Sequence, residues 1–314
     1  MRFVVVDFNH MAHRYYNSAP HLSSVIKVNG VTTEADTTIA NYTSKALYRY
    51  GGYGDYHMGI CLEGGSDFRK EYFKTSDVDG GYKAGREKMS YSFKQSMDLA
   101  VKMMNMAGFT TYQVLGYEAD DLVYTVVQKI KSVNGVTPID IITNDADLLP
   151  LVDEQVSVYM RGTREFNFPN SPTRKLYFQV TPDSWEQYVK GASAFKGFYI
   201  PYNAMLLFKL IRGDKSDNIP ASLKGYGGKS FSALMRKMEA DGVDFAKAFR
   251  YGMDFDTDMK PILQVYFNEA ELAKLRWTYE GLGLRMFNGN LTALKQMPLE
   301  KMQATYSKIG INIK

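Results

Sequence analysis

The chain has 314 residues, 45% of them hydrophobic, and a net charge of +4, so it can bury a full core in one or two domains. No apolar run approaches the ~18 residues of a membrane span, and the apolar stretch of the N-terminal MRFVVVDF is too short for a signal peptide. A single cysteine, Cys61, excludes an internal disulfide and a cysteine-based zinc site, so we expect an intracellular, soluble, globular protein.

Short apolar strands alternate with helical patterns in the first half of the chain. The expected strands are RFVVVDF (2–8), DYHMGICLEG (55–64), FTTYQVLG (109–116) and PIDIITND (138–145). Apolar residues at helical spacing predict helices over 35–50, 87–107 and 119–131. This alternation predicts an α/β fold with a mainly parallel central sheet flanked by helices.

The pattern becomes helical after Val180. Helices are expected in TPDSWEQYV, NAMLLFKLI, KSFSALMRKM and EAELAKLRWTYEGL, with loops rich in Gly, Asn and Asp. We therefore expect an α/β core over residues 1–190 and a helical part over 191–314. The helical part holds 18 Lys/Arg and 12 Asp/Glu, which favours contact with a polyanion.

Acidic residues follow every one of the four expected strands. They are Asp7, Glu63, the group Glu118, Asp120 and Asp121, and the pair Asp145 and Asp147. A single group of this kind is typical of the first turn of a helix, where the N–H groups favour acids. Seven acids at one edge of a parallel sheet would repel one another unless cations neutralise them. Oxygen-only donors indicate hard divalent ions, Mg²⁺ or Mn²⁺.

The helical part adds two more acids in GDKSDNIP (213–220). Asp214 and Asp217 are three residues apart, so one turn can present both on the same side. Taken alone, this stretch is typical of a loop with Asp caps. Together with the other acids it is enough for two ions that activate a water and clamp a phosphodiester.

These segments resemble the structure-specific 5′ nucleases, also called flap endonucleases. That family includes the 5′ nuclease domain of bacterial DNA polymerase I and the bacteriophage 5′–3′ exonucleases that remove RNA primers. The matching segments, in family order, are VVVDFNH, YKAGR, GYEADDLV, ITNDADLLPL, GDKSDNIP and KGYGGKS. They span roughly residues 2–240, and no polymerase domain accompanies them in the sequence. The chain therefore resembles a stand-alone enzyme of the bacteriophage type.

The resemblance implies a hydrolase of the PIN-like 5′ nuclease fold that requires two Mg²⁺ ions, with Mn²⁺ as a substitute. It would cut phosphodiesters near the 5′ end of branched, nicked or RNA-primed duplexes during DNA replication, including RNA–DNA hybrids in a ribonuclease H activity. The metal ligands implied by motif are Asp7, Glu118, Asp120, Asp121, Asp145, Asp147, Asp214 and Asp217. The family usually has Asp after the second strand; here Glu63 is the expected ligand, with Asp67 as the substitute.

The resemblance also implies an arch over the active site at about 65–107. Lys83 and Arg86 in YKAGREK would touch the scissile phosphate as catalytic cations, and Tyr82 would stack on a base. Taken alone, this stretch is typical of a solvated basic turn.

KGYGGKSFSALM resembles the family's helix-hairpin-helix, expected here at about 205–238. Its glycines would let backbone N–H groups approach a DNA strand, and a K⁺ ion would bridge to phosphate. The residues expected to bind DNA are Lys224, Gly225, Gly227, Lys229, Arg236 and Lys237, with Arg14 as a further contact. A Walker A motif is excluded because no G-x-x-x-x-G precedes the Gly-Lys-Ser.

Two other functions fit parts of this pattern. A PIN-type ribonuclease shares the acidic strand ends but lacks the hairpin and GDxSDN motifs. A catalytically inactive DNA-junction binder would have lost some of the acids. We expect a monomeric cytoplasmic enzyme, in the host cell if phage-encoded, that binds DNA and no membrane and meets other replication proteins. RGTREF and SPTRKLYF (161–178) are expected to form a basic surface hairpin.

Overall fold

A computed structural model describes residues 2–28, 31–51, 56–74, 81–86, 88–133, 138–161, 177–296 and 298–312. The chain divides into two compact units. Unit 1 contains Met1–Gly64, Glu87–Asn144 and Phe287–Lys314, and unit 2 contains Gly65–Arg86 and Asp145–Met286. Each unit combines stretches that are separated in the sequence. The division into two domains at residue 190 stays a prediction.

Unit 1 is built on parallel strands in the order β5-β4-β1-β6. The strands are β1 (Arg2–Asp7), β4 (Tyr56–Cys61), β5 (Thr110–Tyr112) and β6 (Ile139–Ile142), with β9 (Lys295–Gln296) antiparallel to β4. The register pairs Asp7 with Cys61, and Cys61 with Tyr112, so these strands end at one edge. The predicted mainly parallel sheet is confirmed.

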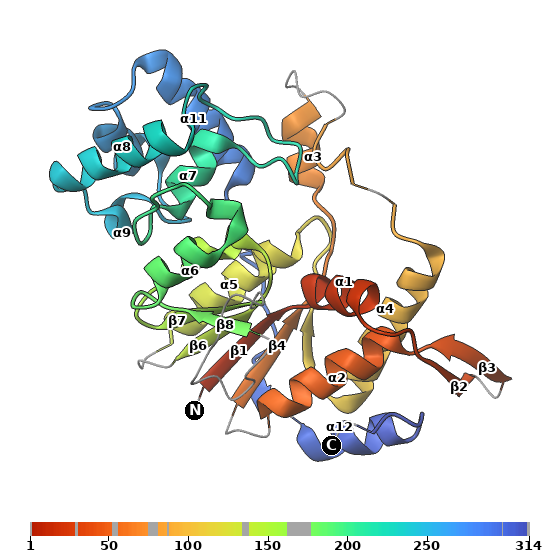
Figure 1. Cartoon of the computed structure of the whole chain (residues 1–314). Coiled ribbons are helices and arrows are strands. Elements are labelled where there is room, and N and C mark those ends of the chain that lie inside the picture. Colours follow the sequence, from red (N-terminus) through yellow and green to blue (C-terminus); the bar gives the residue numbers. More distant parts are fainter. Residues whose placement is uncertain are drawn as a thin grey trace. The chain divides into compact units, whose positions relative to one another are not determined.

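Helices flank these strands. They are α1 (Phe8–Ser18), α2 (Thr38–Gly51), α4 (Tyr91–Ala107), α5 (Ala119–Lys131) and α12 (Leu299–Ser307). Helix α4 starts where Ser90 accepts a hydrogen bond from the Phe93 N–H, and it ends at Gly108 with a φ of 90°. Helix α5 lies against β1 and β4, and α12 lies against α4 (Figure 1). The C-terminal segment thus belongs to the α/β unit.

Unit 1 also carries an antiparallel pair that the sequence did not predict. Strands β2 (Ser23–Val28) and β3 (Val31–Asp36) pair along their whole length, and Figure 1 shows them projecting beyond α4. Asp36 ties β3 to the helices, because its carboxylate accepts hydrogen bonds from the Thr38 N–H and the Ser96 hydroxyl at 2.8 and 2.9 Å. The strand alternation is weak here, which explains why the pair was missed.

A buried charge in β6 makes the stability of unit 1 depend on pH. Burial raises the pKa of Asp140 to about 6, although Arg2, whose Nε lies 3.2 Å from the carboxylate, lowers it. Because the folded protein binds this proton more tightly than the unfolded chain, protonation of Asp140 stabilises the fold fully at pH values below the ordinary pKa of 3.8. This stabilisation is lost as the pH rises through about 6. The shift corresponds to about 3 kcal/mol.

We therefore expect the free energy of unfolding of the wild type to fall by about 2 kcal/mol relative to Asp140→Asn between pH 4 and pH 7, since at pH 4 the carboxyl of the unfolded chain is already partly ionised. Urea denaturation at a series of pH values measures both proteins. Parallel pH profiles for the two would contradict this account of Asp140.

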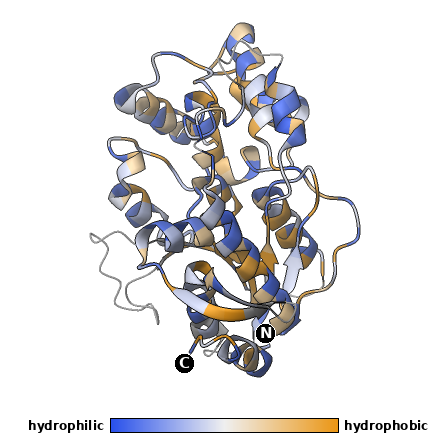
Figure 2. Ribbon diagram, turned by 90° about the vertical axis from the view of Figure 1, so that its right-hand side faces the viewer, coloured by the Kyte–Doolittle hydropathy of each residue, from blue (hydrophilic) through white to orange (hydrophobic). Residues whose placement is uncertain are grey.

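Unit 2 is mainly helical. Its α-helices are α3 (Asp67–Lys74), α6 (Trp185–Gly191), α7 (Met205–Arg212), α8 (Gly228–Ala240), α9 (Phe245–Ala248), α10 (Lys260–Leu263) and α11 (Glu269–Leu282). Two 3₁₀ helices, η1 (Ala146–Leu151) and η2 (Ser193–Phe195), and one π-helix, η3 (Phe255–Met259), are also described. The strands β7 (Val156–Arg161) and β8 (Tyr177–Val180) form an antiparallel pair. The helices show hydrophobic and hydrophilic stripes in Figure 2, as expected for helices that each bury one face.

Several sequence predictions can be compared with these elements. All four expected strands are present, and the helices expected at 119–131 and 87–107 correspond to α5 and α4. Residues 81–86, within the expected arch, form turns and no helix. Most of the basic hairpin expected at 161–178 lies outside the described residues. Within the described residues, no helix is both long enough and apolar enough to cross a membrane.

Candidate metal centre

Asp7 ends β1 and is almost fully buried within unit 1. Its side chain is 1% exposed, and Oδ2 accepts a hydrogen bond from the Thr143 hydroxyl at 2.7 Å. His10, one turn into α1, places Nε2 3.8 Å from the same oxygen. A carboxylate this deep is costly to bury without compensating charge. Its position at the carboxyl end of a parallel strand is where ligands of α/β sheets bind.

Glu63 follows β4 by two residues and points toward the same elements. Its Oε2 accepts hydrogen bonds from Asn9 Nδ2 at 3.4 Å and from the Ala119 N–H at 3.3 Å. Glu63 therefore joins the ends of β4, α1 and α5 within unit 1. Asp67, the substitute considered from the sequence, lies in unit 2 with a side chain 81% exposed and 3.9 Å from Lys70. Asp67 thus has the surroundings of a surface residue.

The three acids before and within α5 have different local roles. Glu118 and Asp121 form a capping box, in which each side chain accepts a hydrogen bond from the backbone N–H of the other. Both are almost fully buried. Helix capping therefore accounts for part of the acidic group, as the first-turn interpretation expected. Asp120 takes no part in the capping box.

The thiol of Cys61 reports the negative potential at this edge of the sheet. Burial raises the pKa of Cys61 well above its ordinary value, and the charges of Asp7 and Asp120 raise it further. Two carboxylates from different elements thus act on one buried group. This concentration of negative charge suits cation binding at the carboxyl ends of β1 and β4.

Asp145 and Asp147 form the acidic pair of unit 2. Asp145 caps η1 by accepting a hydrogen bond from the Asp147 N–H at 2.9 Å. Each of the two offers a carboxylate oxygen within 4.8 Å of the other, and both side chains are partly buried. That separation allows both oxygens to bind the same divalent ion, at the 2.0–2.6 Å typical of Mg²⁺ and Ca²⁺.

Lys209 contacts two of the candidate ligands and was not among the residues predicted from the sequence. It lies in α7, is 7% exposed, and forms ion pairs with Asp147 and, at 3.0 Å, with Asp214. Helix α7 packs on η1, which brings these groups together. The pKa of Asp214 lies below its ordinary value. Burial raises this pKa, but the charge of Lys209 and hydrogen bonds from Ser216 and Lys209 lower it by more. The signal in the sequence was a lysine inside the apolar stretch LLFKLI.

Asp217 has a different set of neighbours. Its carboxylate accepts hydrogen bonds from the Tyr82 hydroxyl at 2.9 Å and from Arg86, and Lys83 Nζ lies 3.9 Å away. Among the described residues, Lys209 and Ser216 contact Asp214, whereas Tyr82, Lys83 and Arg86 contact Asp217, although the spacing of the two acids predicted one common face. The structure does bring together the three residues of YKAGR that the resemblance singled out.

Tyr82 is buried in an apolar cluster of unit 2. Its side chain is 9% exposed, and its ring stacks on Phe73 with centroids 5.6 Å apart. Ile219 and Leu282 complete the cluster. Base stacking by Tyr82, expected from the resemblance, would require the ring to leave this cluster.

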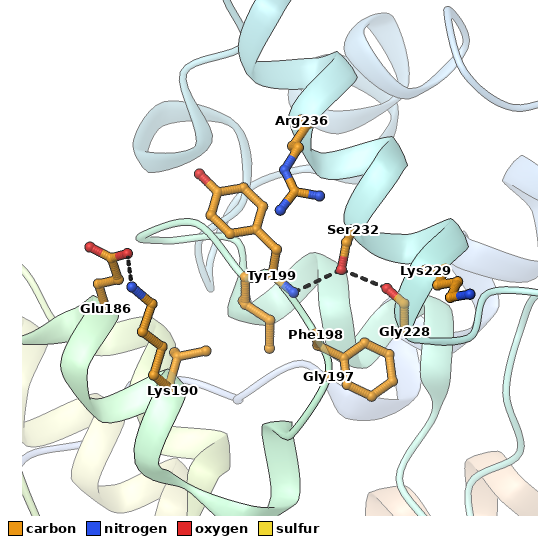
Figure 3. A pocket seen from close by; sticks show the side chains of 11 residues that line it. Glu186, Lys190, Gly197, Phe198, Tyr199, Gly228, Lys229, Ser232 and Arg236 are labelled. Carbon is orange, nitrogen blue, oxygen red and sulfur yellow. Dashed lines mark hydrogen bonds and ion pairs between the residues drawn. The ribbon is translucent and has the colours of Figure 1, made fainter.

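The glycine-rich hairpin precedes α8 and adjoins a cavity of about 530 Å³ (Figure 3). The Ser230 hydroxyl donates to the carbonyls of Gly225 and Gly227, and Gly225 has a φ of 88°, so a side chain would be strained there. Figure 3 shows Lys229 and Arg236 on α8 beside the cavity, with the Arg236 guanidinium 4.9 Å from the Tyr199 ring centroid.

The other expected DNA contacts lie at separate places. Lys224 is exposed before the hairpin, and Lys237 lies on α8 with its Nζ 5.3 Å from the Tyr266 ring centroid. Arg14 belongs to α1 in unit 1, where its guanidinium lies 5.3 Å from the Tyr15 ring centroid. The cations of the hairpin and α8 thus belong to unit 2, whereas Arg14 belongs to unit 1.

Comparison with known proteins adds to this geometry. Residues 2–177 match the family described as 5′–3′ exonuclease, N-terminal resolvase-like domain. A thermostable DNA polymerase I of Thermus thermophilus is 28% identical over 237 residues, which cover 75% of this chain and 24% of that protein. A 5′–3′ exonuclease of Bacillus subtilis is 25% identical over 225 residues, which cover 72% of this chain and 66% of that protein. The chain thus spans about a quarter of the polymerase's length.

Two solved structures of bacteriophage T5 proteins have a similar fold. One is a T5 protein crystallised with metal ions, with a TM-score of 0.53 and 15% identity, covering 100% of this chain and 95% of that chain. The other is a T5 flap endonuclease in a pseudo-enzyme–product complex with DNA and metal ions, with a TM-score of 0.54 and 15% identity, covering 99% and 94%. At this identity the likeness concerns the fold.

Proposed function

The chain belongs to the 5′–3′ exonuclease family, and on that premise we propose that it is a divalent-metal-dependent hydrolase of phosphodiesters. It cuts near the 5′ end of branched, nicked or RNA-primed duplexes, as a flap endonuclease and 5′–3′ exonuclease. The observation that carries the proposal is the pair Asp145 and Asp147, whose carboxylate oxygens lie within 4.8 Å of each other inside the matched span.

The proposed ions are Mg²⁺, with Mn²⁺ as a substitute. The donor set fits them, since it consists of carboxylates on partly or fully buried side chains and contains no thiolate. When bound, such ions polarise a phosphate and lower the pKa of water. The proposed ligands are Asp7, Glu63, Glu118, Asp120 and Asp121 in unit 1 and Asp145, Asp147 and Asp214 in unit 2.

The cations of unit 2 have two proposed tasks. Lys83 and Arg86 stabilise the negative charge that develops on the scissile phosphate. Lys224, Lys229, Arg236 and Lys237 contact phosphates along one strand of a duplex, which positions the DNA without reading its sequence. The backbone of the hairpin, turned by Gly225 and Gly227, is the proposed K⁺ and phosphate site.

Cleavage of two labelled substrates tests the proposed function. A 5′-labelled flap duplex and a single-stranded RNA are each incubated with the protein in Mg²⁺ and in EDTA. We expect short 5′ fragments from the flap duplex in Mg²⁺ alone. Cleavage of the RNA without cleavage of the flap would indicate a PIN-type ribonuclease, and duplex binding without cleavage of either would indicate a junction binder.

Removal of one phosphate contact should weaken duplex binding at all sequences. We expect Lys229→Ala to lower the affinity and to reduce the slope of log K against log salt by about 0.9, the value for one phosphate contact. Fluorescence anisotropy in EDTA over a salt series gives both quantities. Lys247→Ala is the matched control, because Lys247 belongs to α9 and not to the hairpin or α8, its side chain is 84% exposed, and its Nζ lies 3.6 Å from Asp244. An unchanged slope for Lys229→Ala would contradict the assignment.

A further inference from the structure

The carboxylate of Asp217 is surrounded by donors from the segment 81–86. Asp217 is 6% exposed, and its two oxygens accept from the Tyr82 hydroxyl at 2.9 Å and from the Arg86 guanidinium. Lys83 adds an ammonium group 3.9 Å away. One carboxylate thus binds both proposed catalytic cations of this segment and the tyrosine beside them.

Two hydrogen bonds to backbone carbonyls also join the segment 81–86 to residues 217–218. The Lys83 N–H donates to the Asp217 carbonyl at 3.0 Å, and the Asn218 side chain donates to the Gly81 carbonyl at 2.9 Å. Lys83 has a φ of 56°, in the left-handed region that lysine rarely adopts, and Asn218 has a φ of 60°, which Asn adopts more readily than other non-glycine residues. Strained residues persist where the surroundings fix them, so this junction is tightly specified.

The apolar cluster under the junction holds the same segment. Tyr82 stacks on Phe73, and Ile219, two residues after Asp217, packs into the cluster with Leu282. The phenol of Tyr82 therefore has its ring in the core and its hydroxyl on Asp217. Removing this hydroxyl would leave the ring in place and break only the polar contact.

From these contacts we propose that Asp217 is a positioning residue, which fixes Lys83 and Arg86 beside the reacting phosphate, and is no metal ligand. An ion bound directly to Asp217 would lie beside the positive charges of Arg86 and Lys83, which already neutralise this carboxylate and would repel a divalent cation. Asp145 and Asp147 offer carboxylate oxygens within 4.8 Å of each other, and Asp147 also pairs with Lys209. The proposal rests on the proposed function only in assigning the phosphate to Lys83 and Arg86.

Metal binding and trypsin cleavage test this role without any nuclease assay. Asp217→Asn is compared with Asp214→Asn, the same substitution three residues away, in Mn²⁺ titrations followed by electron paramagnetic resonance. We expect Asp217→Asn to keep the wild-type number of bound ions and their affinity. We also expect trypsin to cut after Lys83 and Arg86 roughly tenfold faster, the factor for losing one charge-assisted hydrogen bond.

Tyr82→Phe provides a second variant that removes no carboxylate and keeps the ring. It should speed the same two trypsin cuts and leave Mn²⁺ binding unchanged, whereas Asp214→Asn should leave those cuts at the wild-type rate. Loss of a bound ion in Asp217→Asn, with unchanged trypsin cleavage, would overturn the proposal and make Asp217 a ligand.

A double-mutant cycle on kcat distinguishes positioning from ligation further. If Asp217 acts through Arg86, Asp217→Asn should cost little more when Arg86 is already Ala. If the fold-loss in kcat of the double variant equals the product of the fold-losses of the two single variants, the residues act independently and the proposal is overturned. Should the wild type cut no substrate, the proposed function fails, while the Mn²⁺ and trypsin measurements still decide the role of Asp217.

Discussion

The Asp145→Asn, Asp147→Asn double variant is expected to lose cleavage of a 5′ flap by roughly 1,000-fold or more, at the upper end of what removing one charge-stabilising group costs. The reason is that the substitutions replace two negatively charged carboxylates, whose oxygens lie within 4.8 Å of each other, by neutral amides that bind a divalent ion weakly. Asn still caps a helix, so η1 keeps its first turn. The rate of release of a labelled 5′ fragment in Mg²⁺ measures the effect.

Duplex binding of the same variant separates chemistry from recognition. The affinity measured by anisotropy should stay close to that of the wild type, because the proposed phosphate contacts lie on the hairpin and α8. Asp183→Asn, an exposed position of unit 2, is the matched control and should cleave normally. Normal cleavage by the double variant would remove this acidic pair from the mechanism.

Lys209→Met is expected to destabilise the protein by about 3–5 kcal/mol in EDTA, the cost of removing one partner from buried ion pairs. Lys209 is 7% exposed and is paired with Asp147 and Asp214, so its loss leaves two mostly buried carboxylates without their cation. Met has a similar length and fills the apolar path along α7. Urea denaturation at neutral pH measures the difference in the free energy of unfolding.

Lys215→Met is the matched control, since Lys215 is exposed in the turn next to Asp214. Surface substitutions of this kind usually change stability by less than about 0.5 kcal/mol. A Lys209→Met variant as stable as this control would show that the network contributes no net stability. Adding Mg²⁺ should reduce the deficit of Lys209→Met if the two acids bind the ion.

The local parts of the fold could be predicted from the sequence. Helix α5 was predicted over 119–131 and is found there, because its apolar stripe and its acidic first turn are both local signals. Strand β1 ends at Asp7, where the apolar run FVVV (3–6) meets an acid. Parallel strands then align their carboxyl ends, so acids far apart in sequence could be expected at one edge.

The contacts between distant segments could not be predicted in the same way. The C-terminal segment returns to unit 1, where the Tyr112 hydroxyl donates to the Thr292 carbonyl at 2.7 Å and Lys129 donates to the Gly289 carbonyl at 2.8 Å. No periodicity in residues 287–312 shows this pairing. The sequence pattern instead assigned the segment to the helical part that precedes it.

Side-chain partners at the site were also beyond the pattern. The spacing of Asp214 and Asp217 is compatible with one shared ion, yet Lys209 binds the first and Tyr82, Lys83 and Arg86 meet the second. Which cation reaches which carboxylate depends on how α7 and the segment 81–86 pack. The motif gave the acids as one group of residues and gave no information on the partner of each.

The dependence of cleavage on metal concentration is the most direct test of the account. The rate of release of the 5′ fragment from a labelled flap duplex is measured against Mg²⁺ concentration, with protein that has been freed of metal by chelation. We expect no release without Mg²⁺ and a rate that rises to saturation as Mg²⁺ is added. Release that persists in excess chelator, or a bound duplex that stays intact at every concentration of Mg²⁺ and Mn²⁺, would contradict it.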